Sequence, residues 1–170
     1  FHDKSRSVGH FMMLVVTEIS EMVEADRKNR HANPKGFKKC IGLTYNDRFK
    51  NYVKDTFEDE MADVIIRICD FCGMLCADGG VELPIVDVDM SAEYTDLFLR
   101  MTVCEQCYEL VRLVSEVYEG SDDYDIQKYL GSIVVFLFNM ARVMDIDLAW
   151  HIDRKMDYNE QRARMHGKQY

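Results

Sequence analysis

Two acidic pairs, each set in an apolar pattern of helical spacing, most constrain how this chain can fold. The first pair is Glu18-Ile-Ser-Glu21 and the second is Glu60-Met-Ala-Asp63. Around each pair, apolar residues recur at the three- and four-residue intervals of one helix face, which predicts two long amphipathic helices. Carboxylates three residues apart lie roughly 60° apart on a helix, so each pair forms one acidic edge.

The rotational position of the acids predicts how the two helices pack. Glu18 and Glu60 lie roughly 90° and 80° from the centres of their apolar stripes at about 100° per residue. Glu21 and Asp63 lie roughly 150° and 140° away, in the same rotational sense. Equal offsets fall on the same side of a helix pair only when the helices are antiparallel. Antiparallel packing would therefore bring four carboxylates together at the edge of a core.

Four converging carboxylates favour a bound cation, because without one they would repel each other strongly. Mg²⁺ prefers oxygen ligands and commonly bridges to substrate phosphates. We therefore predict a metal site built from Glu18, Glu21, Glu60 and Asp63, with Mg²⁺ as the expected ion and Mn²⁺ as its alternative. The other interpretation is that both pairs are solvated faces of amphipathic helices, and at this point both interpretations stand.

The composition restricts the class of protein. A chain of 170 residues with 48% hydrophobic content suits one domain with a sizeable core. Its net charge of −9 argues against nucleic-acid polymers and anionic membranes as partners. No apolar run has the length of a membrane span. Six cysteines without a visible secretory signal indicate reduced thiols, and hence a cytoplasmic location.

The periodicity predicts an all-α fold, an antiparallel bundle of about five helices in a single domain spanning 1–170. Only two prolines interrupt the chain. The expected helices cover about 7–29, 46–77, 91–119, 126–144 and 147–165. The acidic pairs fall within 7–77, a helical middle segment covers 78–145, and a tail helix follows over 146–166. A basic loop, which includes Lys38 and Lys39, joins the first two helices.

Three stretches of the chain together resemble a known family. They are 16–28 around the first acidic pair, 57–70 around the second, and Lys155-Met-Asp-Tyr-Asn-Glu-Gln-Arg162. The combination resembles the MazG-type branch of the all-α nucleoside triphosphate pyrophosphohydrolases. That family has a four-helix core, binds Mg²⁺ through its four acids and cleaves NTPs or dNTPs between the α and β phosphates. The segment 78–145 does not match its short members, and the 38 residues between Glu21 and Glu60 imply an enlarged loop.

The resemblance assigns roles to residues near both ends of the chain. It implies that the four acids bind the metal and that Lys155, Asn159 and Arg162 contact the phosphates or the nucleotide. These three residues are spaced at i, i+4 and i+7, on one face of the tail helix. Basic side chains are needed to neutralise the pyrophosphate leaving group, and the basic loop, with Lys38 and Lys39, could supply them. The other interpretation, a solvated loop without this role, also stands. Glu21 is the first candidate for the general base and Glu18 the second. The short members complete their bundle by dimerising. Here the apolar helix expected over 126–144 could complete it within one chain, but apolar residues on several helix faces favour a homodimer.

Two other functions compete with a nucleotide pyrophosphohydrolase. The first is a non-catalytic helical scaffold or regulatory protein that keeps the bundle without turnover. The second is a four-cysteine zinc protein, suggested by Cys69-x-x-Cys72 and Cys104-x-x-Cys107. Both cysteine pairs lie within helical patterns that lack the tight turns of zinc sites, which favours buried thiols that act as small hydrophobes.

Overall fold

All regular secondary structure in the described part of the chain is helical, which confirms the all-α class. The computed structural model describes residues 7–77, 92–119 and 123–161. Its helices are α1 (Val8–Arg27), α2 (Pro34–Lys39), α3 (Tyr45–Tyr52), α4 (Phe57–Ala77), α5 (Ala92–Arg100), α6 (Val103–Glu119), α7 (Asp123–Val143) and α8 (Leu148–Glu160). The expectation of five helices was too low, because two predicted helices are broken and a short helix forms in the basic loop. The predicted loops at 78–90 and 120–122 lie outside the described residues.

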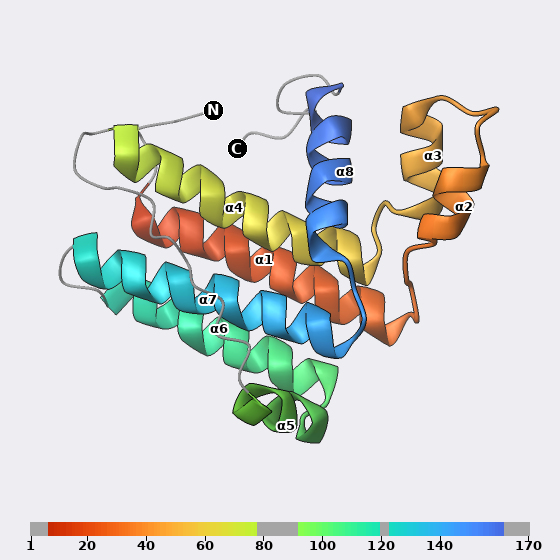
Figure 1. Ribbon diagram of the computed structural model, residues 1–170. Helices are drawn as coiled ribbons and strands as arrows, with labels where there is room; N and C mark the ends of the chain where they lie inside the picture. The colour runs from red at the N-terminus through yellow and green to blue at the C-terminus, as the bar shows by residue number, and fades with distance from the viewer. Residues whose placement is uncertain (1–6, 78–91, 120–122, 162–170) are drawn as a thin grey trace.

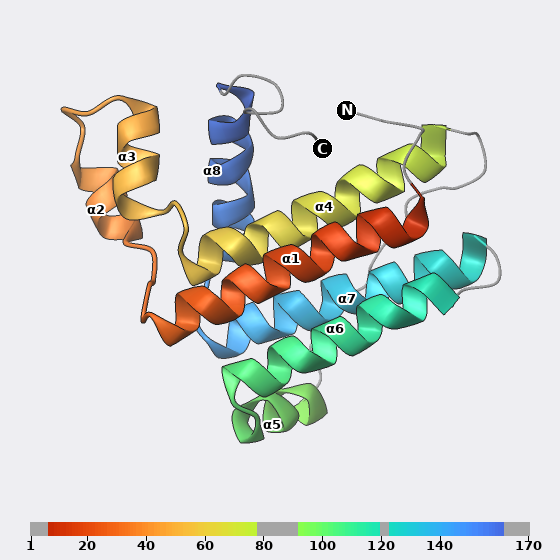
Figure 2. The ribbon, with the colours of Figure 1, turned by 180° about the vertical axis from the view of Figure 1, so that it is seen from behind.

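The four long helices α1, α4, α6 and α7 form a bundle in which neighbouring helices are antiparallel, while α4 and α6 run in the same direction (Figure 1). α1 runs from left to right in this view and α4 from right to left, so the two helices that carry the acidic pairs are antiparallel, as predicted. α1 packs against both α4 and α6, and α6 packs against α7. Figure 2 shows the same order from behind. Each helix contributes fully buried side chains to one core, including Val15, Met61, Leu110 and Leu137.

A break between α3 and α4 replaces the single helix that the sequence predicts over 46–77. The Thr56 hydroxyl donates to the Val53 carbonyl at 2.6 Å and accepts from the Asp59 N–H at 3.4 Å, so Thr56 caps a new helix. In the segment that joins α3 to α4, Asp55 adopts a left-handed backbone conformation with φ of 58°. The break places Glu58, Asp59 and Glu60 in the first turn of α4, where the helix dipole favours negative charge.

A second break, between α5 and α6, interrupts the helix predicted over 91–119. Thr102 and Glu105 form a capping box at the start of α6. The Thr102 N–H donates to the Glu105 carboxylate at 2.7 Å, and the Glu105 N–H donates to the Thr102 hydroxyl at 3.3 Å. α5 consequently turns away from α6 and packs against α7.

Asp147 caps the start of the tail helix α8, because its side chain accepts a hydrogen bond from the Trp150 N–H at 3.1 Å. It crosses the first turns of α4 and packs against α3 (Figure 1). Phe49 of α3 stacks on Tyr158 of α8 with ring centroids 4.3 Å apart. Trp150 meets Phe37 of α2 edge-on at 5.5 Å. These aromatic contacts form a second, smaller core that attaches the α2–α3 segment to α8.

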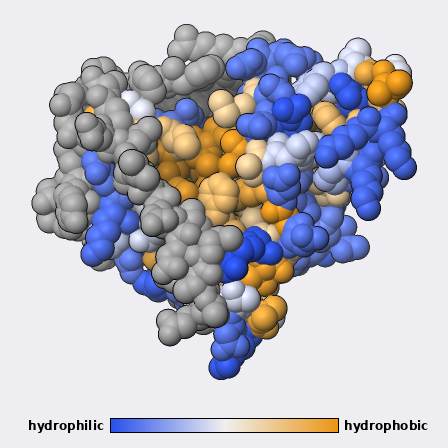
Figure 3. All heavy atoms as spheres, in the orientation of Figure 1, coloured by the Kyte–Doolittle hydropathy of each residue, from blue (hydrophilic) through white to orange (hydrophobic). Residues whose placement is uncertain are grey.

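Apolar side chains reach the surface of the described residues in several places, two of which are clear in Figure 3. Figure 3 shows an apolar area in the middle of one face, where α1 lies between α4 and α7. It also shows apolar residues at the outer tip of the α2–α3 segment, where Ile41 and Leu43 are exposed. Within the described residues, no single helix has the length and apolar content to cross a membrane; only parts of α7 and α8 meet that test jointly, as a pair bent by 112°.

Candidate metal centre

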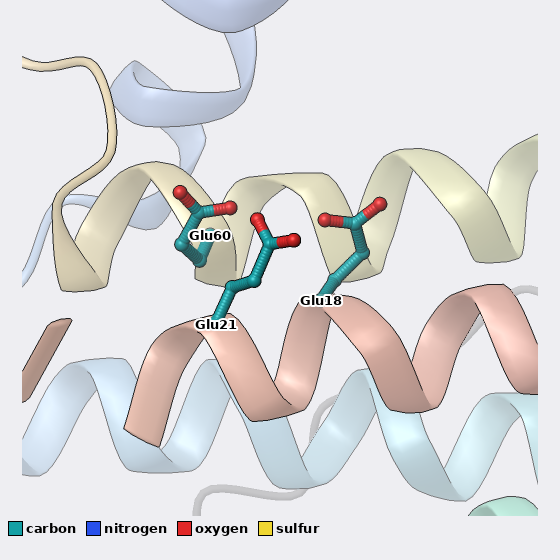
Figure 4. Close-up of side chains that lie close together, drawn as sticks. All are labelled: Glu18, Glu21 and Glu60. Carbon is teal, nitrogen blue, oxygen red and sulfur yellow. The ribbon is translucent and has the colours of Figure 1, made fainter. Parts of the chain in front are cut away.

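Glu18, Glu21 and Glu60 come together between α1 and α4 (Figure 4). One carboxylate oxygen from each lies within 4.8 Å of the others. Glu18 and Glu60 are buried, and Glu21 is exposed. The arrangement follows from antiparallel packing of two helices whose acidic edges have matching offsets. Three of the four predicted ligands are therefore close enough to hold one cation.

Asp63, the fourth predicted ligand, lies beside this group but is engaged with a lysine. Its Oδ2 atom is 2.6 Å from Nζ of Lys155. The negative charge of Asp63 still contributes to raising the pKa values of Glu18 and Glu60, after the larger effect of burial. Asp63 thus belongs to the same electrostatic cluster, while its carboxylate already has a cationic partner.

Lys155 projects from α8 into the acidic cluster, and its side chain is only 7% exposed. Besides Asp63, its Nζ donates to Oδ2 of Asp59 at 2.9 Å. Burial alone would lower the pKa of Lys155, but the two aspartates outweigh burial and raise it, so the ammonium stays charged. The resemblance made Lys155 a nucleotide contact, and in this structure its partners are carboxylates.

The other predicted nucleotide contacts are Asn159, Arg162, Lys38 and Lys39, and those that the structure describes form no side-chain hydrogen bond or ion pair with this cluster. Asn159 is half-buried, one helical turn beyond Lys155 on α8. Arg162 lies outside the described residues. Lys38 and Lys39 are in the last turn of α2, away from the buried face of that helix.

Lys38 lies over the ring of Trp150, with Nζ 5.6 Å from the ring centroid. The two residues line a cleft of about 280 Å³ together with His151 and Glu58. None of the three clustered glutamates lines this cleft. The cleft is therefore a separate feature of the surface, and we assign it no role in the metal centre.

Arg67 and Asp59 belong to the cluster, and the sequence-based prediction missed both. Nε and Nη2 of Arg67 each lie 2.9 Å from Oε1 of Glu18. Arg67 follows Asp63 by four residues on α4, so helical spacing already placed it on the acidic face. Asp59 directly precedes Glu60 but points toward α8, where Lys155 pairs with it. The contact between Asp59 and Lys155 depends on where α8 packs, so the sequence around Asp59 does not predict it.

Burial raises the pKa values of Glu18, Asp59 and Glu60. Burial, followed by the charges of Asp59 and Asp63, raises the pKa of Glu60 to about 8. Burial also raises the pKa of Asp59 to about 6, against the opposing effect of Lys155. Burial and Asp63 raise the pKa of Glu18, with Arg67 acting against them. A cation that binds this cluster would have to displace protons, so its affinity should increase with pH.

Glu60 is the least satisfied group in the cluster. Its side chain is 5% exposed, yet it accepts no hydrogen bond and forms no ion pair with any residue that the structure describes. Figure 4 shows one of its oxygens turned toward Glu21. Buried carboxylates are normally paired or bound to a metal. The donor set consists of oxygens only, which fits Mg²⁺ or Mn²⁺.

The cysteines do not form a comparable site. Across the described residues, two groups bring three or more potential metal ligands together, and both consist of carboxylates. Cys72 and Cys107 are buried, whereas Cys69 and Cys104 are exposed. Burial raises the pKa of Cys107 to about 12, which disfavours the thiolate that zinc requires. The geometry offers the four-cysteine zinc hypothesis no support.

Comparisons with known proteins identify no relative of this chain. No protein-family model, no curated protein and no solved structure matches it. The similarity to the MazG-type enzymes therefore rests on the sequence motifs alone.

Proposed function

We propose that this chain is a Mg²⁺-dependent nucleoside triphosphate pyrophosphohydrolase, which converts an NTP or dNTP to a nucleoside monophosphate and pyrophosphate. The observation that carries the proposal is the buried carboxylate of Glu60, which has no partner among the described residues and lies within 4.8 Å of Glu18 and Glu21. A buried cluster of this kind is costly without a cation, so it favours a functional metal site over a solvated surface.

Glu18, Glu21 and Glu60 would hold the ion, with Asp63 adjacent. When bound, Mg²⁺ neutralises phosphate oxygens and so lowers the barrier to attack on phosphorus. Mn²⁺ would fill the same role, because it accepts the same oxygen ligands.

Glu21 is the better candidate for the general base. Glu18 is buried, and its Oε1 accepts a hydrogen bond from Nε of Arg67 and pairs with Nη2 of the same guanidinium, so its charge is already partly neutralised. Glu21 is exposed, and its carboxylate has no hydrogen bond or ion pair to a described residue. Its carboxylate would take a proton from a water molecule while the water oxygen attacks phosphorus, and pyrophosphate would leave.

Positive side chains would then have to stabilise the leaving pyrophosphate. Lys155 already lies within the cluster, so it would reach a phosphate oxygen by exchanging one of its carboxylate partners. Asn159 and Arg162 follow it along the tail, and Lys38 and Lys39 extend from α2. We propose these five residues as the phosphate and nucleotide contacts.

The assembly and compartment are part of the same proposal. The apolar area on the face between α4 and α7 supports a homodimer, since large exposed apolar patches often mark interfaces. Cys40, Cys69, Cys104 and Cys107 carry free thiols, which suit a reducing compartment, and we propose the cytoplasm. Light scattering on the purified full chain tests the dimer, and a strictly monomeric active protein would contradict it.

One observation favours a second candidate function, a non-catalytic helical scaffold. Lys155 and Arg67 already neutralise part of the acidic cluster from within the chain. Such internal pairing would let the bundle persist without any metal. In that case the purified protein would show neither turnover nor a thermal shift with Mg²⁺.

The deciding experiment is a panel of NTPs and dNTPs with detection of released pyrophosphate, in Mg²⁺ and in EDTA. We expect Mg²⁺-dependent release for at least one nucleotide. Glu21→Gln should lower it by about 10²–10⁴-fold, the usual contribution of a general base. Glu24→Gln is the matched control, since Glu24 is exposed on the same helix and pairs only with neighbouring basic residues. Absence of release from every nucleotide, or equal effects of the two variants, would reject the proposal.

A further inference from the structure

A second group of carboxylates lies at the break between α3 and α4. Asp55, Asp59 and Glu60 each place an oxygen within 4.8 Å of the others. Asp55 belongs to the connecting segment, and the other two belong to the first turn of α4. Glu60 is common to this group and to the Glu18–Glu21 group.

The hydrogen bonds of this second group leave oxygen atoms unused. Oδ2 of Asp59 accepts from Lys155 Nζ at 2.9 Å and from the Asp55 N–H at 3.0 Å. Oδ1 of Asp59 is buried and accepts no hydrogen bond. Glu60 is 5% exposed and has no hydrogen-bond or ion-pair partner within the described chain. Asp55 is exposed and pairs with Lys54. Two buried carboxylates thus present unpaired oxygen atoms to the same small region.

The charge of the combined cluster exceeds what one divalent ion neutralises. The two groups and their neighbour Asp63 contain six carboxylates: Glu18, Glu21, Asp55, Asp59, Glu60 and Asp63. Three cationic side chains pair with them: Lys54, Arg67 and Lys155. Fully ionised, six acids and three cations leave three excess negative charges. One divalent ion therefore leaves one excess negative charge, and a second divalent ion reverses it to one excess positive charge, which a bound anion such as a phosphate would offset.

We propose that Asp55, Asp59 and Glu60 form a second divalent-cation site, which shares the Glu60 carboxylate with the first. Because the donors are all oxygens, the site suits a hard ion such as Mg²⁺, Mn²⁺ or Ca²⁺. Lys155 can keep its bond to Oδ2 of Asp59 while Oδ1 of the same residue binds the ion. The site adds a cation beside the proposed catalytic centre, yet cation binding here does not require that the protein hydrolyse nucleotides.

The stoichiometry of Mn²⁺ binding tests this inference. Electron paramagnetic resonance of free Mn²⁺, followed while the full-length protein is titrated, counts bound ions without reference to activity. The wild type should bind two ions per chain, and their signals should couple magnetically because they share one carboxylate. Asp55→Asn should bind one. Asn is nearly isosteric with Asp and tolerates the left-handed backbone at this position, where φ is 58°.

Two further variants make the outcome decisive. Asp145→Asn is the control: Asp145 is also left-handed, with φ of 57°, but lies outside both carboxylate groups, so this variant should bind two ions. Glu21→Gln alters only the first group and should leave one ion. Circular dichroism would verify that all variants fold.

A wild type that binds a single Mn²⁺, or an Asp55→Asn variant that still binds two, would overturn the second site. Two bound ions without nucleotide turnover would support the second site and reject the proposed enzyme activity. Turnover with a single bound ion would reject only the second site. The two proposals therefore fail independently.

Discussion

The ammonium of Lys155 lies between two carboxylates of α4, 2.6 Å from Oδ2 of Asp63 and 2.9 Å from Oδ2 of Asp59. Asp59 is 1% exposed, so this contact attaches α8 to the bundle through buried charges. Such a pair adds little net stability compared with apolar residues, because both charges lose their hydration. Removing one partner should lower stability strongly, because the other charge is then buried without a neutralising partner.

Replacement of Lys155 by Met should therefore destabilise the protein by about 3–5 kcal/mol, the usual cost of breaking a buried ion pair. Denaturant unfolding in EDTA measures this free energy. Adding Asp59→Asn to Lys155→Met should recover part of the loss, because it removes the unpaired charge. Lys128→Met on the outer face of α7 is the control and should change stability little. Equal effects of Lys155→Met and Lys128→Met would show that the buried pair is not formed in solution.

Phe49 should be a second determinant of how α2, α3 and α8 are held together. It is completely buried and stacks on Tyr158, so Phe49→Ala should cost about 3–5 kcal/mol through lost burial and a cavity. Limited proteolysis should cleave the α2–α3 segment faster in this variant. Ile41→Ala, at a side chain that is 86% exposed, should leave both stability and cleavage near wild type. Unchanged cleavage in Phe49→Ala would contradict the docking role of this small core.

Helical period and burial were sufficient to predict the pairing of α1 with α4. The apolar stripe of each helix fixes which face is buried, and the offsets of Glu18 and Glu60 from that face then determine where the acids meet. Both properties are local to one helix. With antiparallel packing assumed, these offsets predict that Glu18, Glu21 and Glu60 lie close together, as they do in the structure.

The helix breaks and the cationic partners were harder to anticipate. Thr56-x-x-Asp59 and Thr102-x-x-Glu105 are capping signals that lie inside continuous apolar patterns, and capping prevailed over the periodicity. Arg67 shares a helix face with Asp63, so its position was readable from the sequence. The pairing of Lys155 with Asp59 depends on the angle at which α8 crosses α4, and no local pattern encodes that angle.

The cysteines should act as packing residues. Cys72→Ala and Cys107→Ala should each lower stability modestly, because both thiols are buried in the main core. Cys69→Ala and Cys104→Ala, at exposed positions, should have smaller effects. Elemental analysis of the purified wild type should find no stoichiometric zinc. About one zinc per chain, lost in these variants, would restore the four-cysteine hypothesis.

The pH dependence of stability should report directly on Glu60. Its pKa rises from an ordinary value of 4.5 to about 8 in the folded chain, chiefly through burial. The folded state therefore binds this proton more tightly than the unfolded state does. The resulting stabilisation is fully present below pH 4.5 and is lost as the pH rises through about 8. In EDTA, the melting temperature of the wild type should fall from about pH 4.5 to about pH 8 and level off above that. Asp59, whose pKa rises from 3.8 to about 6, adds to the acidic part of this fall.

Glu60→Gln should abolish most of this fall, because the amide keeps the shape of the side chain and cannot ionise. At pH 8.5 the metal-free variant should then melt above the metal-free wild type. Glu160→Gln, at an exposed position on α8, should follow the wild-type curve. Saturating Mg²⁺ should raise the wild-type melting temperature more at pH 8.5 than at pH 6.5. At the higher pH the Glu60 carboxylate is largely ionised, so the ion does not have to displace its proton. A wild-type curve that stays flat over this range in EDTA would mean that the Glu60 carboxylate is not buried as the structure places it, and the basis for a metal centre between α1 and α4 would be lost.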